Sequence, residues 1–156
     1  MAKTWNIYLS GEIHTAWRDE IAEGIKARDL PVSLSAPVTD HPASDDCGVA
    51  ILGAEENKFW HDRKGAQVNA IRTQTLIKDA DIVVVRFGEK YKQWNAAFDA
   101  GYAAALGKPI IVNHGPDIVH PLKEVDAAAM AVAETPAQIV EILDYVINGN
   151  LKGYTS

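Results

Sequence analysis

One carboxylate of this chain stands where it could do chemistry. Asp99 follows a buried apolar run, Ile82 to Arg86, and a loop, and it lies in the first turns of an alanine-rich helix. Such a unit brings the loop and the helix start to the carboxyl edge of a parallel sheet, where open α/β folds bind small ligands. Partial burial would raise the pKa of Asp99, but we expect the helix N-terminus to keep it ionised and nucleophilic. The alternative is a solvated helix residue without a role.

A second group of candidates surrounds the end of the first apolar run. Ser10 and Gly11 follow Tyr8 at this point, and Glu12 and His14 come next. A side chain at Gly11 would block a ligand's approach to the following helix, although a plain tight turn explains the glycine equally well. Glu12 and His14 could titrate or bind a ligand. A single glycine is not the Gly-x-Gly-x-x-Gly pattern, so the sequence does not support a dinucleotide site.

Aromatic and amide side chains mark three further junctions. Trp94 and Asn95 begin the helix of Asp99, where the indole could stack on a base and the amide could cap the helix or bind a hydroxyl. Trp60 precedes another helix and Asn113 follows a buried strand. Packing explains both tryptophans without a ligand, since a hydrophobic staple places an apolar residue before a helix. The five histidines never take a metal-ligand spacing, so we expect no metal and no redox cofactor.

Alternating apolar runs and amphipathic segments must position these residues. Strands without polar alternation indicate burial on both faces, and strands alternating with helices imply right-handed crossovers. The sequence therefore predicts one α/β domain over residues 1–156, a doubly wound, flavodoxin-like, five-stranded parallel sheet with helices on both faces. The expected strands are 5–9, 31–35, 82–86, 109–113 and 128–133, and the expected helices are 12–29, 62–78, 94–106 and 136–147.

Three details of this prediction are specific enough to be tested. Residues 36–58 lack a steady period and are expected to form a long surface loop, of the kind that often covers a binding site. The inward positions of helix 62–78 are expected to be Val68, Ile71, Thr75 and Leu76. The buried face of helix 94–106 is expected to contain Trp94, Ala97, Phe98, Gly101, Tyr102 and Ala105.

Composition limits the kind of partner. The net charge is −6 and no basic cluster is present, so long nucleic acid and anionic membranes are disfavoured partners. A single small phosphorylated ligand is compatible with this net charge, because backbone N–H groups can hold a phosphate. Cys47 is the only cysteine, which suits a reducing compartment, and no apolar leader follows Met1. We expect a cytoplasmic protein.

The chain resembles the nucleoside 2-deoxyribosyltransferase-like superfamily and, within it, the YtoQ family. Three blocks carry the resemblance: IYLSGEIHTAWR, HDRKGAQVNAIRTQTLIKDADIVVV and FDAGYAAALGKPIIV. The resemblance implies that Asp99 stands at the position of the nucleophilic Glu and that Tyr8 lines the active site. It also implies a homodimer or a larger homo-oligomer. The chain departs from the pattern at Thr73, where the superfamily usually carries a second carboxylate, and at Gln93, where relatives have Asp or Ser.

Together these observations predict an N-glycosyl-bond enzyme for nucleosides or nucleotides, either a 2-deoxyribosyltransferase or an N-hydrolase. Asp99 would form a covalent glycosyl intermediate, as retaining glycosidases do. Tyr8 would orient Asp99 or contact the sugar. The other candidates would bind the substrate, namely Ser10, Gly11, Glu12, His14, Trp60, Trp94, Asn95 and Asn113. A non-catalytic nucleotide or sugar-phosphate binder is the alternative, and cleavage of NAD or another ribosylated metabolite is a weaker third reading.

Overall fold

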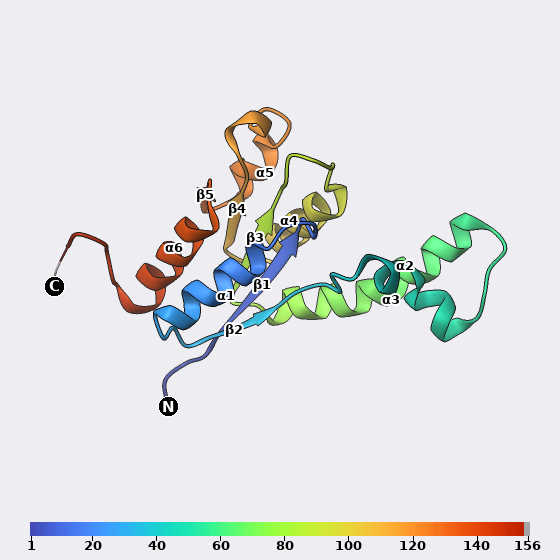
Figure 1. The fold of residues 1–156 in the computed structure, drawn as a ribbon, viewed down its shortest axis with the longest axis horizontal. Helices are drawn as coiled ribbons and strands as arrows, with labels where there is room; N and C mark the ends of the chain where they lie inside the picture. The colour runs from blue at the N-terminus through green and yellow to red at the C-terminus, as the bar shows by residue number, and fades with distance from the viewer. Residues whose placement is uncertain (155–156) are drawn as a thin grey trace.

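Five parallel strands form one sheet in the order β2-β1-β3-β4-β5, which confirms the predicted flavodoxin-like topology. The structure is a computed structural model that describes residues 1–154, so the last two residues of the predicted domain lie outside it. Figure 1 shows the sheet with its helices. The strands are β1 (Trp5–Gly11), β2 (Val32–Ser35), β3 (Ile82–Arg86), β4 (Ile110–Asn113) and β5 (Ala131–Ala133).

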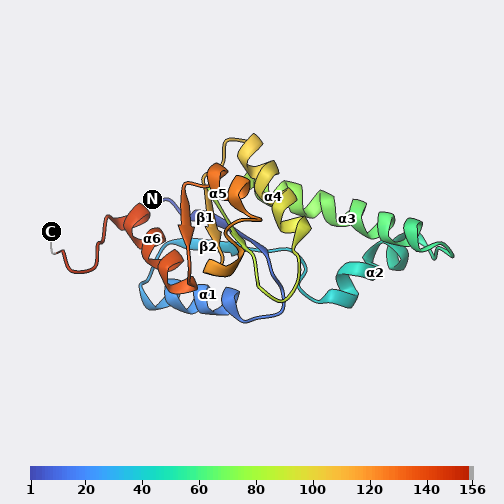
Figure 2. The same cartoon turned by 90° about the horizontal axis from the view of Figure 1, so that it is seen from above.

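Helices cover both faces of the sheet, as Figure 2 shows from above. Helices α1 (Trp17–Ala27) and α6 (Pro136–Asn148) share one hydrophobic core with Ile7 and Leu9 of β1. Helices α4 (Trp94–Ala105) and α5 (Lys123–Ala128) share a second core, on the opposite face, with Tyr8. Successive side chains of a strand point to opposite faces, so a strand that is covered twice must be apolar at every position.

The predicted loop 36–58 is wrong, because its middle forms a helix. Helix α2 (His41–Leu52) packs against α3 (Lys58–Asp79), and together the two form an arm that projects from the sheet (Figure 1). The Asp40 carboxylate caps α2 by accepting a hydrogen bond from the Ala43 N–H at 2.8 Å. Gly48 lets the two helices touch, since a Cβ there would lie 2.3 Å from the backbone nitrogen of Gly65.

Two of the predicted helix starts are also wrong. Helix α1 begins at Trp17 instead of Glu12, because the Glu12 carboxylate binds the N–H groups of the following residues and holds them in a turn. Helix α3 begins four residues earlier than Asp62, where Asn57 caps it through the Phe59 N–H. Both errors come from side-chain hydrogen bonds that the apolar pattern does not record.

The predicted inward faces of α3 and α4 need correction. Ile71 and Thr75 lie in the second half of α3 and are exposed, whereas Ile77 is the residue that this half buries. On α4, Trp94 and Phe98 are exposed, as are Gly101 and Ala105. The residues that α4 buries against the sheet are alanines, whose small side chains let a helix approach closely: Ala96, Ala100 and Ala103.

The end of the chain follows the expected signals. Strand β5 is shorter than predicted because α5 occupies residues up to Ala128. Thr135 caps α6 through the Gln138 N–H, and Gly149 ends the helix in the left-handed conformation with φ of 73°. Within residues 1–154, no helix combines the length and the apolar character that crossing a membrane requires.

Candidate active site

Asp99 and Ser10 meet at the carboxyl edge of the sheet. The Ser10 hydroxyl, on β1, donates a hydrogen bond of 2.6 Å to Asp99 Oδ2, on α4, across 89 positions of sequence. Ser10 is fully buried and Asp99 is half-buried. Among the described residues, no hydrogen bond reaches the second carboxylate oxygen, Oδ1. One oxygen of Asp99 is therefore fixed, and the other is available to a ligand.

The pKa of Asp99 shifts upward. Burial raises it, and the hydrogen bond from Ser10 lowers it by a smaller amount. We expected the helix N-terminus to dominate and to favour the ionised form, and this expectation is wrong in direction. Asp99 lies more than one turn inside α4, where the helix dipole is weak and the loss of solvent decides the balance.

Asp99 opens onto a cavity of about 790 Å³ between the sheet edge and the arm. This volume falls within the range of small-molecule sites. One wall comes from the end of β1 and the start of α4, and the other comes from the β2–α2 connection, α2 and the middle of α3. Of the predicted site residues, the cavity brings together Ser10, Gly11, Glu12, His14, Trp94, Asn95 and Asp99.

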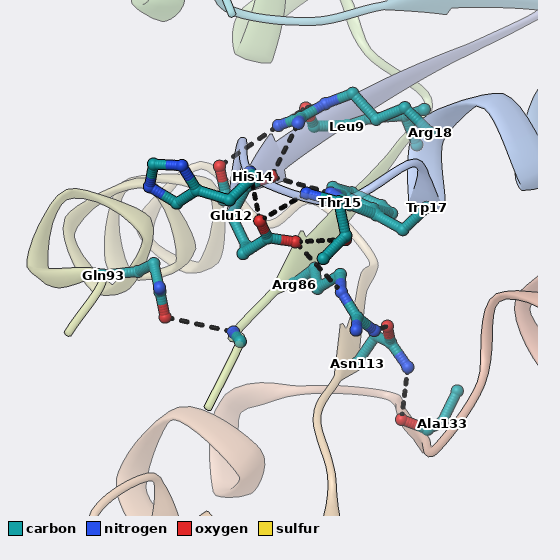
Figure 3. Close-up of polar contacts among 12 residues, drawn as sticks. Leu9, Glu12, His14, Thr15, Trp17, Arg18, Arg86, Gln93, Asn113 and Ala133 are labelled. Carbon is teal, nitrogen blue, oxygen red and sulfur yellow. Dashed lines mark hydrogen bonds and ion pairs between the residues drawn. The ribbon is translucent and has the colours of Figure 1, made fainter. Parts of the chain in front are cut away.

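The turn after β1 is held by the Glu12 carboxylate (Figure 3). Its Oε1 accepts hydrogen bonds from the backbone N–H groups of His14 and Thr15, the latter at 2.8 Å. Its Oε2 accepts the Thr15 hydroxyl at 2.6 Å and faces Arg86 Nε at 3.5 Å. Burial by itself raises the pKa of Glu12, but these partners outweigh burial and the net pKa is lowered. Glu12 is therefore a buried, ionised part of the turn.

Gly11 is required by the backbone. Its φ is 110°, and a Cβ there would lie 2.1 Å from the carbonyl oxygen of Arg86 on the neighbouring strand. The close approach of β1 and β3 therefore explains the glycine without a ligand, as the plain-turn alternative supposed.

Tyr8 lies beneath the cavity and not in its wall. Its side chain is fully buried in the core that α3 and α4 form with the sheet, and among residues 1–154 its hydroxyl faces the Thr73 side chain without a hydrogen bond of ordinary geometry. Burial raises the pKa of Tyr8 to about 12, and the charge of Asp99 adds to this shift. The structure does not show the predicted orientation of Asp99 by Tyr8, and Ser10 makes the contact instead.

Two exposed residues at the start of α4, Trp94 and Asn95, line the cavity beside Asp99. Trp94 is 76% exposed and lines the cavity, in a position that a flat ligand could reach. Asn95 also lines it and does not cap α4, since the N-cap residue is Gln93.

The His14 ring packs on the Tyr91 ring with centroids 4.6 Å apart, which ties the β1–α1 turn to the loop before α4.

Two predicted binding residues lie outside this cavity. Trp60 is at the start of α3, at the end of the arm, and packs edge-to-face on Phe59 with ring centroids 5.0 Å apart. Asn113 is fully buried; its amide accepts a hydrogen bond from Arg86 and donates one to the Ala133 carbonyl at 2.9 Å. A substrate role for either side chain gains no support from its position.

Comparisons with known proteins agree with the fold and the motifs. The model of the family described as nucleoside 2-deoxyribosyltransferase YtoQ matches residues 8–147. The chain belongs to this family. An uncharacterized protein YtoQ from Bacillus subtilis (strain 168) is 44% identical over 140 residues, which cover 90% of this chain and 95% of that protein.

Two solved structures share the fold of this YtoQ-family chain. A 2-deoxyribosyltransferase from Bacillus psychrosaccharolyticus aligns with a TM-score of 0.52 at 17% identity, covering 86% of this chain and 90% of the other. A conserved protein from Enterococcus faecalis V583 aligns with a TM-score of 0.65 at 12% identity, covering 92% and 99%. These identities support a common fold and leave the reaction open.

Thr73 and Gln93, the two positions at which this YtoQ-family chain departs from the superfamily pattern, both lie near the cavity or the loop before α4. Thr73, at the expected position of a second carboxylate, lines the cavity from α3. Gln93 is engaged elsewhere, because its side-chain oxygen accepts the Gly88 N–H at 3.1 Å and so closes the loop before α4. Among the described residues, no group of three or more His, Cys, Asp or Glu side chains could hold a metal ion.

Sequence reasoning missed the wall that the arm supplies. His41 and Ser44 of α2 and Asn69 of α3 line the cavity, and so do Tyr91 and Tyr102. A signal was present, since Asp40 followed by Pro42 marks a helix start just as Thr135 and Pro136 do.

Proposed function

We propose that this protein cleaves the N-glycosyl bond of nucleosides or nucleotides with Asp99 as the nucleophile. The observation that carries the proposal is the pairing of Ser10 with Asp99 on the floor of a ligand-sized cavity. The hydrogen bond fixes one carboxylate oxygen and leaves the other directed at no protein donor in the described structure. Family membership and the fold shared with a 2-deoxyribosyltransferase support the same chemistry.

The reaction follows the double-displacement logic of retaining glycosidases. The free oxygen of Asp99 attacks the anomeric carbon, the bond from that carbon to the base nitrogen breaks, and the base leaves with the bonding electrons and takes up a proton from solvent. A second base, or water, then attacks the same carbon, gives up a proton to solvent and releases the carboxylate. The enzyme would act as a transferase in the first case and as a hydrolase in the second.

The other residues that line the cavity position the nucleophile and bind the two ends of the substrate. Ser10 positions the nucleophile, which must approach the anomeric carbon to within about 3–3.5 Å. Trp94 offers a flat apolar surface for the base, and the turn containing Glu12 and His14 lies at the sugar end. Burial, which raises the pKa of Asp99, also removes solvent from the attacking carboxylate. The proposed chemistry needs no metal.

The test is release of free base from 2′-deoxynucleosides and their 5′-monophosphates, followed by chromatography with and without a second base. Asp99→Asn keeps the side-chain volume and removes the nucleophile, so base release should fall by about a thousandfold or more. Glu141→Gln, an exposed carboxylate on α6, is the matched control and should retain activity. Undiminished base release by Asp99→Asn would contradict the proposal.

A non-catalytic binder is the second candidate, and Thr73 is the observation that favours it. A threonine hydroxyl in the cavity wall cannot supply the charge of the carboxylate that the superfamily pattern places there. Stabilisation of the protein by a nucleoside in a thermal-shift assay, without any base release over long incubation, would favour the binder.

A further inference from the structure

The turn between β1 and α1 is the place where an α/β fold of this strand order can hold a phosphate group. Backbone N–H groups at such a turn point outward and attract anions. In this chain those donors already have acceptors within the protein. The N–H groups of His14 and Thr15 donate to the Glu12 carboxylate, and the Glu12 N–H donates to the Arg86 carbonyl at 3.0 Å.

The Glu12 carboxylate therefore occupies the position that a bound anion would take. It is only 4% exposed, it is tied to Thr15 and Arg86, and it still borders the cavity. A phosphate brought to this turn would meet a fixed negative charge and would find these three N–H groups taken. The close packing of Gly88 on the side chain keeps the carboxylate in place, since a Cβ at Gly88 would lie 2.6 Å from Glu12 Cγ.

The rest of the cavity supplies little positive charge to offset Glu12. Lys92 is the only lysine among the described lining residues and no arginine is among them, whereas four carboxylates line the cavity: Glu12, Asp45, Asp62 and Asp99. The arginines near the sheet edge are engaged elsewhere. Arg18 donates to the carbonyls of Leu9, Gly11 and Glu12, and Arg86 donates to Asn113 (Figure 3).

We propose that Glu12 is a specificity residue that excludes a 5′-phosphate, so that the substrates are nucleosides with an uncharged sugar end and not nucleotides. This inference rests on the proposed function for the identity of the ligand. Beyond that function, Glu12 is the residue that selects substrates with an uncharged sugar end.

The experiment compares 2′-deoxyadenosine with 2′-deoxyadenosine 5′-monophosphate, by base release and by calorimetric binding to Asp99→Asn. We expect the nucleoside to bind at least ~10-fold more tightly than the monophosphate at low salt, because like charges would face each other. Added salt should shrink that ratio only slightly, because Glu12 is buried and salt screens buried charges much less than exposed ones. This measurement needs no change at Glu12, so it stands even where Glu12→Gln fails to fold.

Glu12→Gln, made in the same Asp99→Asn background, keeps the shape of the side chain and removes its charge, and should bring the two dissociation constants to within about threefold. Asp45→Asn, which neutralises a cavity carboxylate on α2 instead of at the turn, should leave the ratio nearly unchanged. Equal or tighter binding of the monophosphate to the protein with Glu12 intact would overturn the inference, as would an unchanged ratio in a folded Glu12→Gln variant.

The two proposals fail separately. Absence of base release from both compounds would contradict the proposed function, while the ratio of dissociation constants would still decide the role of Glu12. Binding of neither compound at millimolar concentration would overturn both.

Discussion

The two walls of the cavity are built differently. The sheet-edge wall rests on buried strands, and its key contact joins Ser10 to Asp99 at 2.6 Å. The arm wall is a pair of helices that pack mainly on each other and leave apolar side chains such as Ile51 and Phe59 in solvent. Local opening costs least where few apolar groups are buried, so the arm is expected to open more easily than the sheet edge.

We therefore expect the two walls to have different roles in catalysis and binding. A nucleophile needs fixed geometry, and the sheet edge supplies it. Substrates of different shape need a wall that can adjust, and the arm can move without disturbing Asp99. Substitutions in the two walls should therefore have separable effects.

Asp99→Asn should affect activity and stability in opposite directions. Base release should be lost, whereas Tm at neutral pH should rise by ~2–4 °C, because the substitution removes a half-buried carboxylate whose charged form burial disfavours. The folded pKa of Asp99 is raised, so its contribution to stability is fully present below the ordinary value of 3.8 and is lost as pH rises through the folded pKa. The Tm difference should therefore disappear in strong acid. A lower Tm for Asp99→Asn at neutral pH would contradict this account.

Gly48→Leu should break the arm and spare the sheet. The new side chain would collide with the backbone at Gly65, and a clash of this kind costs about 1–3 kcal/mol or more. We expect hydrogen exchange to accelerate in α2 while the amides of β1 and β3 keep their protection. Gly101→Ala, on the open face of α4, is the matched control and should leave both regions protected. Loss of protection in β1 would show that the two walls are one cooperative unit.

Ser10→Ala should weaken the nucleophile without removing it. The hydrogen bond from Ser10 lowers the pKa of Asp99, so its loss should raise that pKa further. The acid limb of the kcat/KM profile should then move to higher pH, and activity at neutral pH should fall by ~10-fold or more, since a hydrogen bond to a charged group is removed. Ser33→Ala, an exposed serine on β2, should change neither. An acid limb that stays in place would show that Ser10 has only a packing role.

Trp94→Ala should have the smallest effect, on binding alone. Loss of a stacking surface for a base should raise KM by ~5–10-fold and leave kcat nearly unchanged. Trp60→Ala serves as the control, because Trp60 lies at the end of the arm and outside the cavity, and it should leave KM within about twofold. A larger KM effect at Trp60 than at Trp94 would mean that the arm closes much further over the substrate.

The sequence by itself determined the sheet. Apolar runs covered on both faces have few alternatives to a parallel arrangement, and the flavodoxin-like order was the preferred prediction for five such strands. It also singled out Ser10 and Glu12, because they stand at the carboxyl end of β1, and Asp99, because it lies in the first turns of the helix that follows β3. These features depend on local patterns that a reader can count along the chain.

Tertiary structure alone decided the contacts that give those residues their roles. The Ser10–Asp99 hydrogen bond spans 89 positions, and the capture of backbone donors by Glu12 depends on one side-chain rotamer. The arm was hidden because α2 packs through glycine against α3 and so carries no apolar stripe that faces a sheet. Tyr8 was expected at the active site and is buried beneath it, since the strand position sets its face but not how far its hydroxyl reaches. Spacing can place a residue at an edge, but only packing decides what its side chain touches.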